Sequence, residues 1–175
     1  GDVEEVKKLL QHPLVEPSLE VHSKGGRTAL EEAAGNGHVE VVRALLADGR
    51  ADPAACMSFA LQRAAVFGHD EVLSLLLDDK RADPAAHDNL AVRSTSEKGN
   101  TEVVRLLLSD PRVDPSAQND YAIRWAAQKG RVETVPLLLQ DPRVDGTRAI
   151  ENADPHVVPV LLEHERCGIV VNRDM

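Results

Sequence analysis

The chain has 175 residues, of which 42% are hydrophobic and 2% aromatic, and its formal net charge is −9. This acidic balance argues against binding to a nucleic-acid backbone or to an anionic membrane surface, because both need clustered Lys and Arg. The apolar residues are mostly Leu, Val and Ala, which suits thin helical layers better than a thick globular core.

A five-residue pattern, Asp-x-Arg-[Ala/Val]-Asp, recurs through the chain with a fixed period. Each copy starts 31 residues after the one before, and a glycine recurs at the same interval. A period of this length is typical of stacked repeat proteins, which usually form an extended surface and seldom a single catalytic pocket. The copies begin at Asp48, Asp79, Asp110 and Asp141, and the glycines are Gly37, Gly68, Gly99 and Gly130.

An amphipathic helix is predicted at the start of the chain, in residues 1–10, and another after each recurring glycine. Apolar residues recur there at three and four positions, which is the spacing of one helix face. Asp70 and Thr101, just after their glycines, are plausible helix starts. These second helices of the repeat are expected at residues 39–47, 70–77, 101–108 and 132–139.

A shorter helical pattern precedes each glycine. A small residue at one fixed position lets neighbouring helices approach closely, and a short polar side chain at the start can cap free N–H groups. The glycine ends this helix in a left-handed turn, and Asp-Pro pairs favour an extended link after the second helix. The first helices are expected at residues 28–34, 59–65, 90–96 and 121–127, the small residues are Ala33, Ala64, Thr95 and Ala126, and the caps are Ser58, Asn89 and Asp120.

Helix, glycine turn, helix and polar link together resemble the ankyrin repeat. The match is closest from Thr28 to Leu46, which follows the ankyrin pattern T-P-L-H-x-A-A-x-x-G-H-x-x-V-V-x-x-L-L. The resemblance covers about residues 1–163 and implies an all-α solenoid of αα-hairpin repeats. Ankyrin repeats usually have a period of about 33 residues. The shorter period here predicts a short turn where the family has a β-hairpin finger.

The repeats are expected to form a single array over residues 1–175. Residues 1–10 match a second helix without its first, so we expect further repeats upstream in the full protein. At the other end, residues 147–153 are expected to form only a stub of a first helix, and Ile169, Val170 and Val171 to cover the last helix. The expected parts are a partial first repeat with a long finger (1–27), repeats at 28–58, 59–89, 90–120 and 121–146, and a truncated capping repeat (147–175).

No catalytic, metal or cofactor motif is visible in the sequence, so we expect neither an enzyme nor a bound cofactor. The seven histidines lack zinc-like spacing, and His38 and His69 are expected to form hydrogen bonds in turns. A calcium loop does not place Arg between its carboxylates. We therefore expect Arg81 and Arg112 to pair with an Asp of the neighbouring repeat. Two distant cysteines form no disulfide framework, which favours an intracellular protein, cytoplasmic or nuclear.

The expected function is binding of another protein on the concave face of the solenoid, with a purely structural spacer as the alternative. The net charge of −9 favours a basic partner, and we expect a monomer that binds neither nucleic acid nor membrane. The resemblance implies that contacts come from the finger tips and from the ends of the first helices, where the copies differ most. Met57 and Phe67 are expected to form an apolar centre.

Tyr121 and Trp125 allow two interpretations, packing in the core or an aromatic anchor of an interface. Other repeats have Glu32, Arg63 and Ser94 at the position of Trp125, which keeps the second interpretation open. The predicted partner-binding residues are Arg27, Asn36, Met57, Val66, Phe67, His87, Asp88, Glu97, Lys98, Asn119, Gln128 and Lys129.

Overall fold

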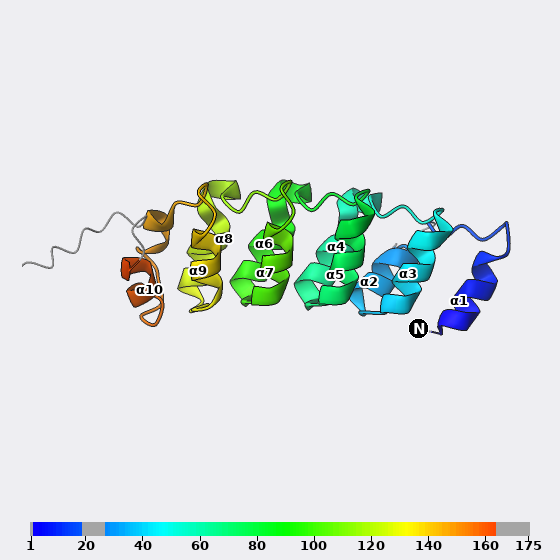
Figure 1. Ribbon diagram of the computed structural model, residues 1–175, viewed down its shortest axis with the longest axis horizontal. Helices are drawn as coiled ribbons and strands as arrows, with labels where there is room; N and C mark the ends of the chain where they lie inside the picture. Colours follow the sequence, from blue (N-terminus) through cyan, green and yellow to red (C-terminus); the bar gives the residue numbers. More distant parts are fainter. Residues whose placement is uncertain (1, 19–26, 164–175) are drawn as a thin grey trace, which may run out of the picture. The chain divides into compact units, whose positions relative to one another are not determined.

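The computed structural model describes residues 2–18 and 27–163, which form helices and no β-strand. The chain divides into two compact units, residues 1–87 and residues 88–175. The first unit holds α1 (Val3–Leu10), α2 (Ala29–Gly35), α3 (Val39–Asp48), α4 (Ala55–Phe67) and α5 (Asp70–Asp79) (Figure 1). The second holds α6 (Ala86–Lys98), which starts just before the boundary, α7 (Thr101–Leu108), α8 (Ala117–Gln128), α9 (Thr134–Leu139), the 3₁₀ helix η2 (Gly146–Ala149) and α10 (Val158–Glu163).

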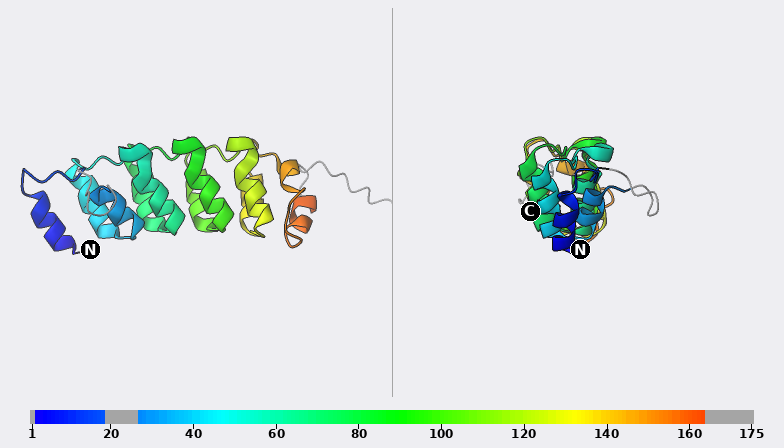
Figure 2. Two further views of the ribbon diagram at one scale, coloured as in Figure 1. Left: turned by 180° about the vertical axis from the view of Figure 1, so that it is seen from behind. Right: turned by 90° about the vertical axis from the view of Figure 1, so that its right-hand side faces the viewer.

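In the first unit, two layers of helices pack on each other. α2 pairs with α3 and α4 with α5 as hairpins, α2 packs on α4, and α3 packs between α1 and α5 (Figures 1 and 2). The small residues Ala33 and Ala64 are buried where these layers meet, next to the buried Leu30 and Leu61. Burial of each leucine stabilises the fold by about 1.5–3 kcal/mol. Neighbouring repeats of this unit therefore share one apolar core.

The second unit follows the same plan. α8 pairs with α9 as a hairpin, α9 contacts both α7 and α10, and α8 packs on η2. Ile123, Leu138 and Leu161 have no measurable exposure. Thr95 is also fully buried, and its hydroxyl donates to the carbonyl of Ala91 at 2.8 Å, so this polar side chain is satisfied inside α6. The predicted small positions are thus core positions in both units.

The recurring glycines end the first helices in the left-handed region, as the sequence predicts. Their φ angles are 71° at Gly37, 75° at Gly68, 82° at Gly99 and 70° at Gly130. A side chain at Gly37 would also meet the ring of His69, whose Nδ1 lies 2.7 Å from an ideal Cβ. Glycine therefore serves both the backbone turn and the close approach of the next repeat.

The first helices α4, α6 and α8 start four residues earlier than the sequence predicts. Each begins with a short turn and then three consecutive residues with left-handed φ angles between 50° and 62°. Regular helix follows only after these three residues. They are Cys56, Met57 and Ser58 in α4, His87, Asp88 and Asn89 in α6, and Gln118, Asn119 and Asp120 in α8. The short turn expected in place of a β-hairpin finger is this left-handed turn.

The two ends of the chain differ from the middle. α1 has no buried residue, and Leu9 remains 53% exposed. Near the other end, the stub expected at residues 147–153 is the short η2, and the second helix that follows is α10. The predicted cover by Ile169, Val170 and Val171, and most of the first finger, lie outside the described residues.

Candidate protein-interaction surface

The last residue of each left-handed turn fixes the turn to the link of the next repeat. The Oγ of Ser58 accepts the N–H of Asp83 at 2.7 Å, and the Oδ1 of Asn89 accepts the N–H of Asp114 at 2.7 Å. The Oδ1 of Asp120 accepts the N–H of Asp145 at 2.9 Å. The prediction that these side chains cap their own helices is therefore wrong. Each acceptor instead satisfies the N–H of an aspartate 25 residues later.

The first two residues of each left-handed turn are exposed and form the tips of the repeats. Met57 is 61% exposed, and Nε2 of His87 lies 3.0 Å from its sulfur. In the second unit, Nε2 of Gln118 donates to Oδ2 of Asp88 at 2.9 Å. Three consecutive left-handed residues turn the chain so that the third side chain is buried while the first two remain accessible. Tip chemistry can therefore vary without loss of the bond made by the third residue.

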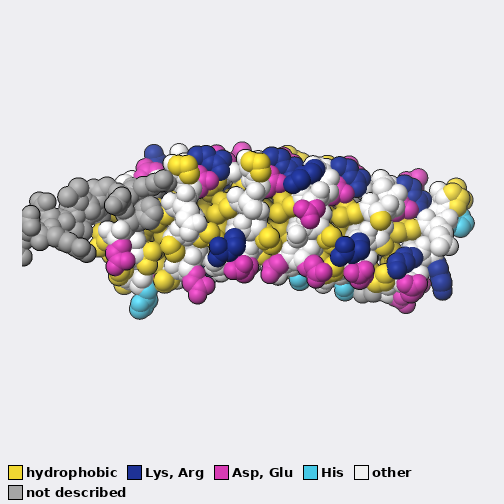
Figure 3. Space-filling view, viewed as in Figure 1, with side chains coloured by type: hydrophobic (Ala, Val, Ile, Leu, Met, Phe, Trp, Pro, Cys, Tyr) yellow, Lys and Arg dark blue, Asp and Glu magenta, His cyan; other side chains and the backbone are white. Residues whose placement is uncertain are grey.

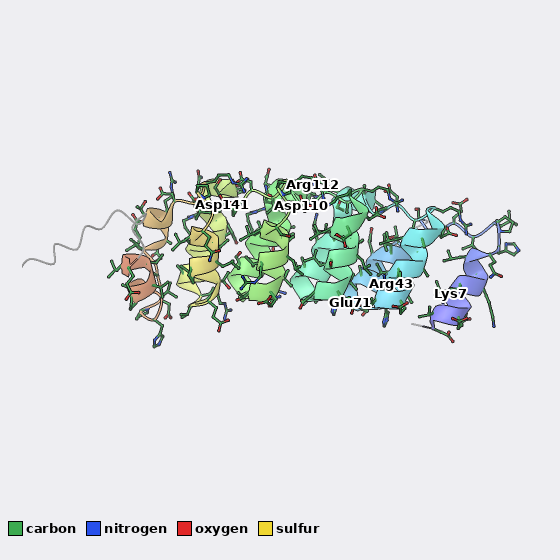
Figure 4. The ribbon with its side chains drawn as sticks, in the orientation of Figure 1. Lys7, Arg43, Glu71, Asp110, Arg112 and Asp141 are labelled. Carbon is green, nitrogen blue, oxygen red and sulfur yellow. The ribbon has the colours of Figure 1, made fainter. Side chains whose placement is uncertain are left out.

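The arginines of the recurring pattern pair with an aspartate of their own copy. Arg81 Nε lies 2.7 Å from Asp79 Oδ1, and Arg112 Nη2 lies 2.7 Å from Asp110 Oδ2; Figure 4 shows the second pair in the link after α7. In both units such charges of opposite sign lie together along the edge formed by the links (Figure 3). Contrary to our expectation, the partner of Arg81 and of Arg112 in these pairs is not an Asp of the neighbouring repeat.

Arginines of the pattern also reach the preceding repeat through backbone carbonyls, and Arg143 Nη1 in addition lies 4.0 Å from Asp114 Oδ1 of that repeat, as expected. Arg81 Nη1 donates to the carbonyl of Ala51 at 3.4 Å, and Arg143 Nη2 donates to that of Val113 at 3.0 Å. The hydrogen bond from Arg81 is the main reason that the pKa of Asp79 is lowered from its ordinary value of 3.8. Each ion pair thus fixes a guanidinium that holds two links together, which gives the recurring pattern a structural role.

Side chains near the glycine turns also donate to carbonyls of the preceding repeat. Nε2 of His69 lies 3.1 Å from the carbonyl oxygen of Gly35, which confirms the turn hydrogen bond predicted for this histidine. Arg131, two periods later, donates through Nε to the carbonyl of Glu97 at 2.9 Å. Residues that repeat in position therefore make the same framework bonds even where their identity changes.

Most of the predicted partner-binding residues are accessible. In the first unit, Asn36, Met57, Phe67 and His87 are exposed, whereas Val66 and Arg27 are half-buried. Arg27 is tied to Glu32, with Nη1 at 3.1 Å from Oε2, and this contact is the main cause of the lowered pKa of Glu32. In the second unit, Asp88, Lys98, Asn119, Gln128 and Lys129 are exposed and Glu97 is half-buried.

Met57 and Phe67 do not form the single apolar centre that the sequence suggests. They lie at opposite ends of α4, and the regular helix between them spans about 12 Å at 1.5 Å per residue. Phe67, which is 55% exposed, instead lies beside Arg63, whose guanidinium carbon is 5.4 Å from the ring centroid. The candidate surface is therefore a strip along each first helix, from the tip to the glycine turn.

The aromatic pair of α8 is half-buried, which agrees with the packing interpretation and leaves part of each side chain accessible. The ring centroids of Tyr121 and Trp125 lie 5.5 Å apart, and Arg93 stacks on Tyr121 at 5.1 Å. Burial is the main cause of the raised pKa of Tyr121, and Glu97, 3.4 Å from its hydroxyl, adds to it. Lys129 lies over the other ring, 5.7 Å from its centroid. Both rings therefore combine packing with polar contacts at the surface.

A pocket of about 550 Å³ opens beside Trp125 in the second unit. The sequence signals no pocket here, because the pocket forms where the four-residue η2 stands in place of a full first helix and covers only part of α8. The only hint was the exchange of Trp125 with polar residues in other copies. Its lining consists of Asn119, Arg124, Trp125, Gln128, Arg148, Ala149, Glu151 and Asn152.

Neither metal chemistry nor membrane insertion has support in the described part of the chain. Within residues 2–18 and 27–163, there is no group of three His, Cys, Asp or Glu side chains that could hold a metal ion. No helix in these ranges has the length and hydropathy needed to cross a bilayer. Accessible features of the described residues include the tips, the ends of the first helices and the pocket.

Comparison with known proteins agrees with this architecture. A family model of three ankyrin repeats matches residues 1–88, which is half of the chain. The structure is similar to the crystal structure of EF0377, an ankyrin repeat protein, with a TM-score of 0.79 and 26% sequence identity over 93% of this chain and 92% of that chain. No curated protein matches the sequence. Ankyrin repeats are generally protein–protein interaction modules and typically not enzymes. With repeated αα-hairpins, glycine turns and this match over half of its length, the chain belongs to the ankyrin repeat family.

Proposed function

We propose that this chain binds another protein through the tips and the ends of its first helices. One observation carries the proposal: positions one period apart are exposed yet chemically different. Asn36, Phe67, Lys98 and Lys129 occupy one such position, and all four are exposed. Framework positions of the same repeats make matching hydrogen bonds. A surface that varies on a fixed framework is what recognition of a particular partner requires.

The strip offers the components of an ordinary protein interface. Phe67 supplies exposed aromatic area, and Met57 a flexible apolar side chain at a tip. Lys98 and Lys129 supply positive charge at the ends of α6 and α8. Such a set of residues favours a partner surface with apolar and acidic positions, in contrast to the basic partner that net charge alone suggests. The contacts would act by complementarity of shape and charge, without a chemical step.

Substitution of three residues of the strip tests the proposal. With a purified partner, the triple variant Phe67→Ala, Lys98→Glu, Lys129→Glu is expected to raise the Kd at least tenfold, that is by about 1.4 kcal/mol or more. Isothermal titration calorimetry measures the change. The matched control is Val132→Ala, Arg43→Glu, Arg105→Glu, which makes the same charge change at exposed positions that are not among the predicted partner-binding residues.

The control is expected to bind like the wild type. Among the described residues its two arginines pair with Glu40 and Glu102 in exposed positions, so their reversal should have little effect on folding. Equal affinities of the triple variant and the wild type would contradict the proposal. If the protein acts as a spacer, no partner binds saturably to this surface.

A further inference from the structure

The pocket beside Trp125 has a structural cause that sets it apart from the rest of the strip. In a complete repeat, a first helix such as α4 packs along its predecessor α2. After α8, the corresponding segment is only the four-residue η2 followed by a turn. One face of α8, with Arg124, Trp125 and Gln128, therefore borders an open space of about 550 Å³.

The lining of this pocket is more basic than the chain as a whole. It contains Arg124, Arg148 and Glu151, and two positive charges minus one negative charge leave +1, in a chain of net charge −9. Asn119, Gln128 and Asn152 add amide groups that can donate hydrogen bonds. Because Arg148 also faces Asp120 and Asp145, Arg124 is the lining charge that is left to pair with a single carboxylate.

Arg124 differs from the arginines of the links. Arg112 and Arg143 each contact both oxygens of a carboxylate, whereas no carboxylate pairs with Arg124 in the described part of the chain. Its Nη2 makes one long bond, 3.4 Å, to the carbonyl of Gln118, and its buried Nε has no hydrogen-bond acceptor within the described residues. The guanidinium of Arg124 therefore carries a charge that no carboxylate in the described residues offsets, and a carboxylate from outside would pair with it.

Arg148 already faces acidic groups, so it limits the charge that the pocket accepts. Its Nε lies 3.5 Å from Asp120 Oδ2 and 3.4 Å from Asp145 Oδ2. Together with Glu151, these carboxylates would repel a doubly charged phosphate more strongly than a single carboxylate. Trp125 adds a half-buried aromatic surface at the same site, on which an apolar or aliphatic side chain can pack.

We propose that this pocket binds an extended acidic segment of another protein, with an Asp or Glu side chain paired to Arg124 and a neighbouring apolar side chain packed on Trp125. This inference deepens the proposed function and rests on it. It names the chemistry of the partner at one site in the second unit. A random peptide can replace the partner as a probe, because the pocket is small enough to be filled by a few residues.

The test starts with a displayed library of random dodecapeptides, selected on the full chain. Enriched peptides are synthesised and titrated while the fluorescence of Trp125, the single tryptophan, is followed. We expect the enriched peptides to contain Asp or Glu beside an apolar residue and to change this fluorescence saturably. Arg124→Gln is expected to weaken binding at least about tenfold. It breaks no ion pair among the described residues, so folding should persist, and circular dichroism checks this.

Three controls sharpen the measurement. Arg105→Gln removes an exposed charge from α7, outside the pocket, and should leave binding unchanged. Replacing the acidic residue of the peptide with its amide should weaken binding to the wild type but add little to the loss in Arg124→Gln, because both changes remove the same interaction. A single-stranded oligonucleotide serves as the competing polyanion and is not expected to bind.

The inference is overturned by enriched peptides without acidic residues, by equal binding to Arg124→Gln, by an absence of enrichment, or by oligonucleotide binding that needs Arg124. A natural partner that loses affinity for the triple variant at Phe67, Lys98 and Lys129 but not for Arg124→Gln would overturn the pocket alone and leave the proposed function standing. A natural partner that binds the triple variant and Arg124→Gln as well as the wild type would count against both the proposed function and the pocket.

Discussion

Replacement of Asn89 tests whether the left-handed turn is held by its third residue. Asn89 is 8% exposed, has φ of 61°, and accepts the N–H of Asp114 at 2.7 Å. Asn89→Ala removes this partly buried bond, a loss of about 1 kcal/mol. Alanine also tolerates the left-handed region less well than asparagine, at a cost of about 1–2 kcal/mol. We therefore expect a free energy of unfolding lower by about 2–3 kcal/mol.

Two companion variants separate these contributions. Asn89→Gly removes the hydrogen bond to Asp114, but glycine adopts the left-handed backbone without strain. It should therefore lower the free energy of unfolding by about 1 kcal/mol. Asn89→Asp keeps the acceptor, and because Asp120 fills the same position naturally, it should stay within about 0.5 kcal/mol of the wild type. Urea unfolding followed by circular dichroism measures all three. The reasoning is refuted if alanine costs no more than glycine, or if aspartate is as damaging as alanine.

Two further changes test the glycine turn and the ion pairs. Gly37→Ala should destabilise more than Gly49→Ala, because φ is positive at both positions but only at Gly37 does an added Cβ meet His69; equal losses would contradict the close approach. Asp79→Asn should destabilise at pH 7, because Arg81 lowers the pKa of the carboxyl in the folded state. That stabilisation is present above the unfolded value of 3.8 and is lost as pH falls through the lower folded value, so the difference from wild type should shrink in acid.

The sequence predicts the structure correctly where a residue type at a given position has a single structural role. A glycine at a fixed interval marks a left-handed turn, and all four recurring glycines adopt one. Small residues between apolar stretches mark close packing, and Ala33, Ala64, Thr95 and Ala126 are buried. The stub near residue 147 was visible as a shortened pattern. These features follow from local sterics and periodicity, and they determine the repeat.

The sequence failed where local chemistry allows two partners. Asp-x-Arg-x-Asp permits an ion pair within a copy or between copies, and only the bend of the link decides that Arg81 meets Asp79. Cys56, Met57 and Ser58 give no sign of a left-handed turn, since neither glycine nor asparagine is among them. Contacts between repeats hold this turn in place. The pocket beside Trp125 likewise depends on what packs next to α8.

The claim that exposed, variable positions of the first helices bind a partner is tested most directly by hydrogen–deuterium exchange of the chain with and without that partner. We expect slower exchange in peptides that contain Met57, Phe67, Lys98 and Lys129, and unchanged exchange in the second helices α3, α5 and α7. Protection of these second helices, with the tips and first-helix ends unaffected, would contradict the account.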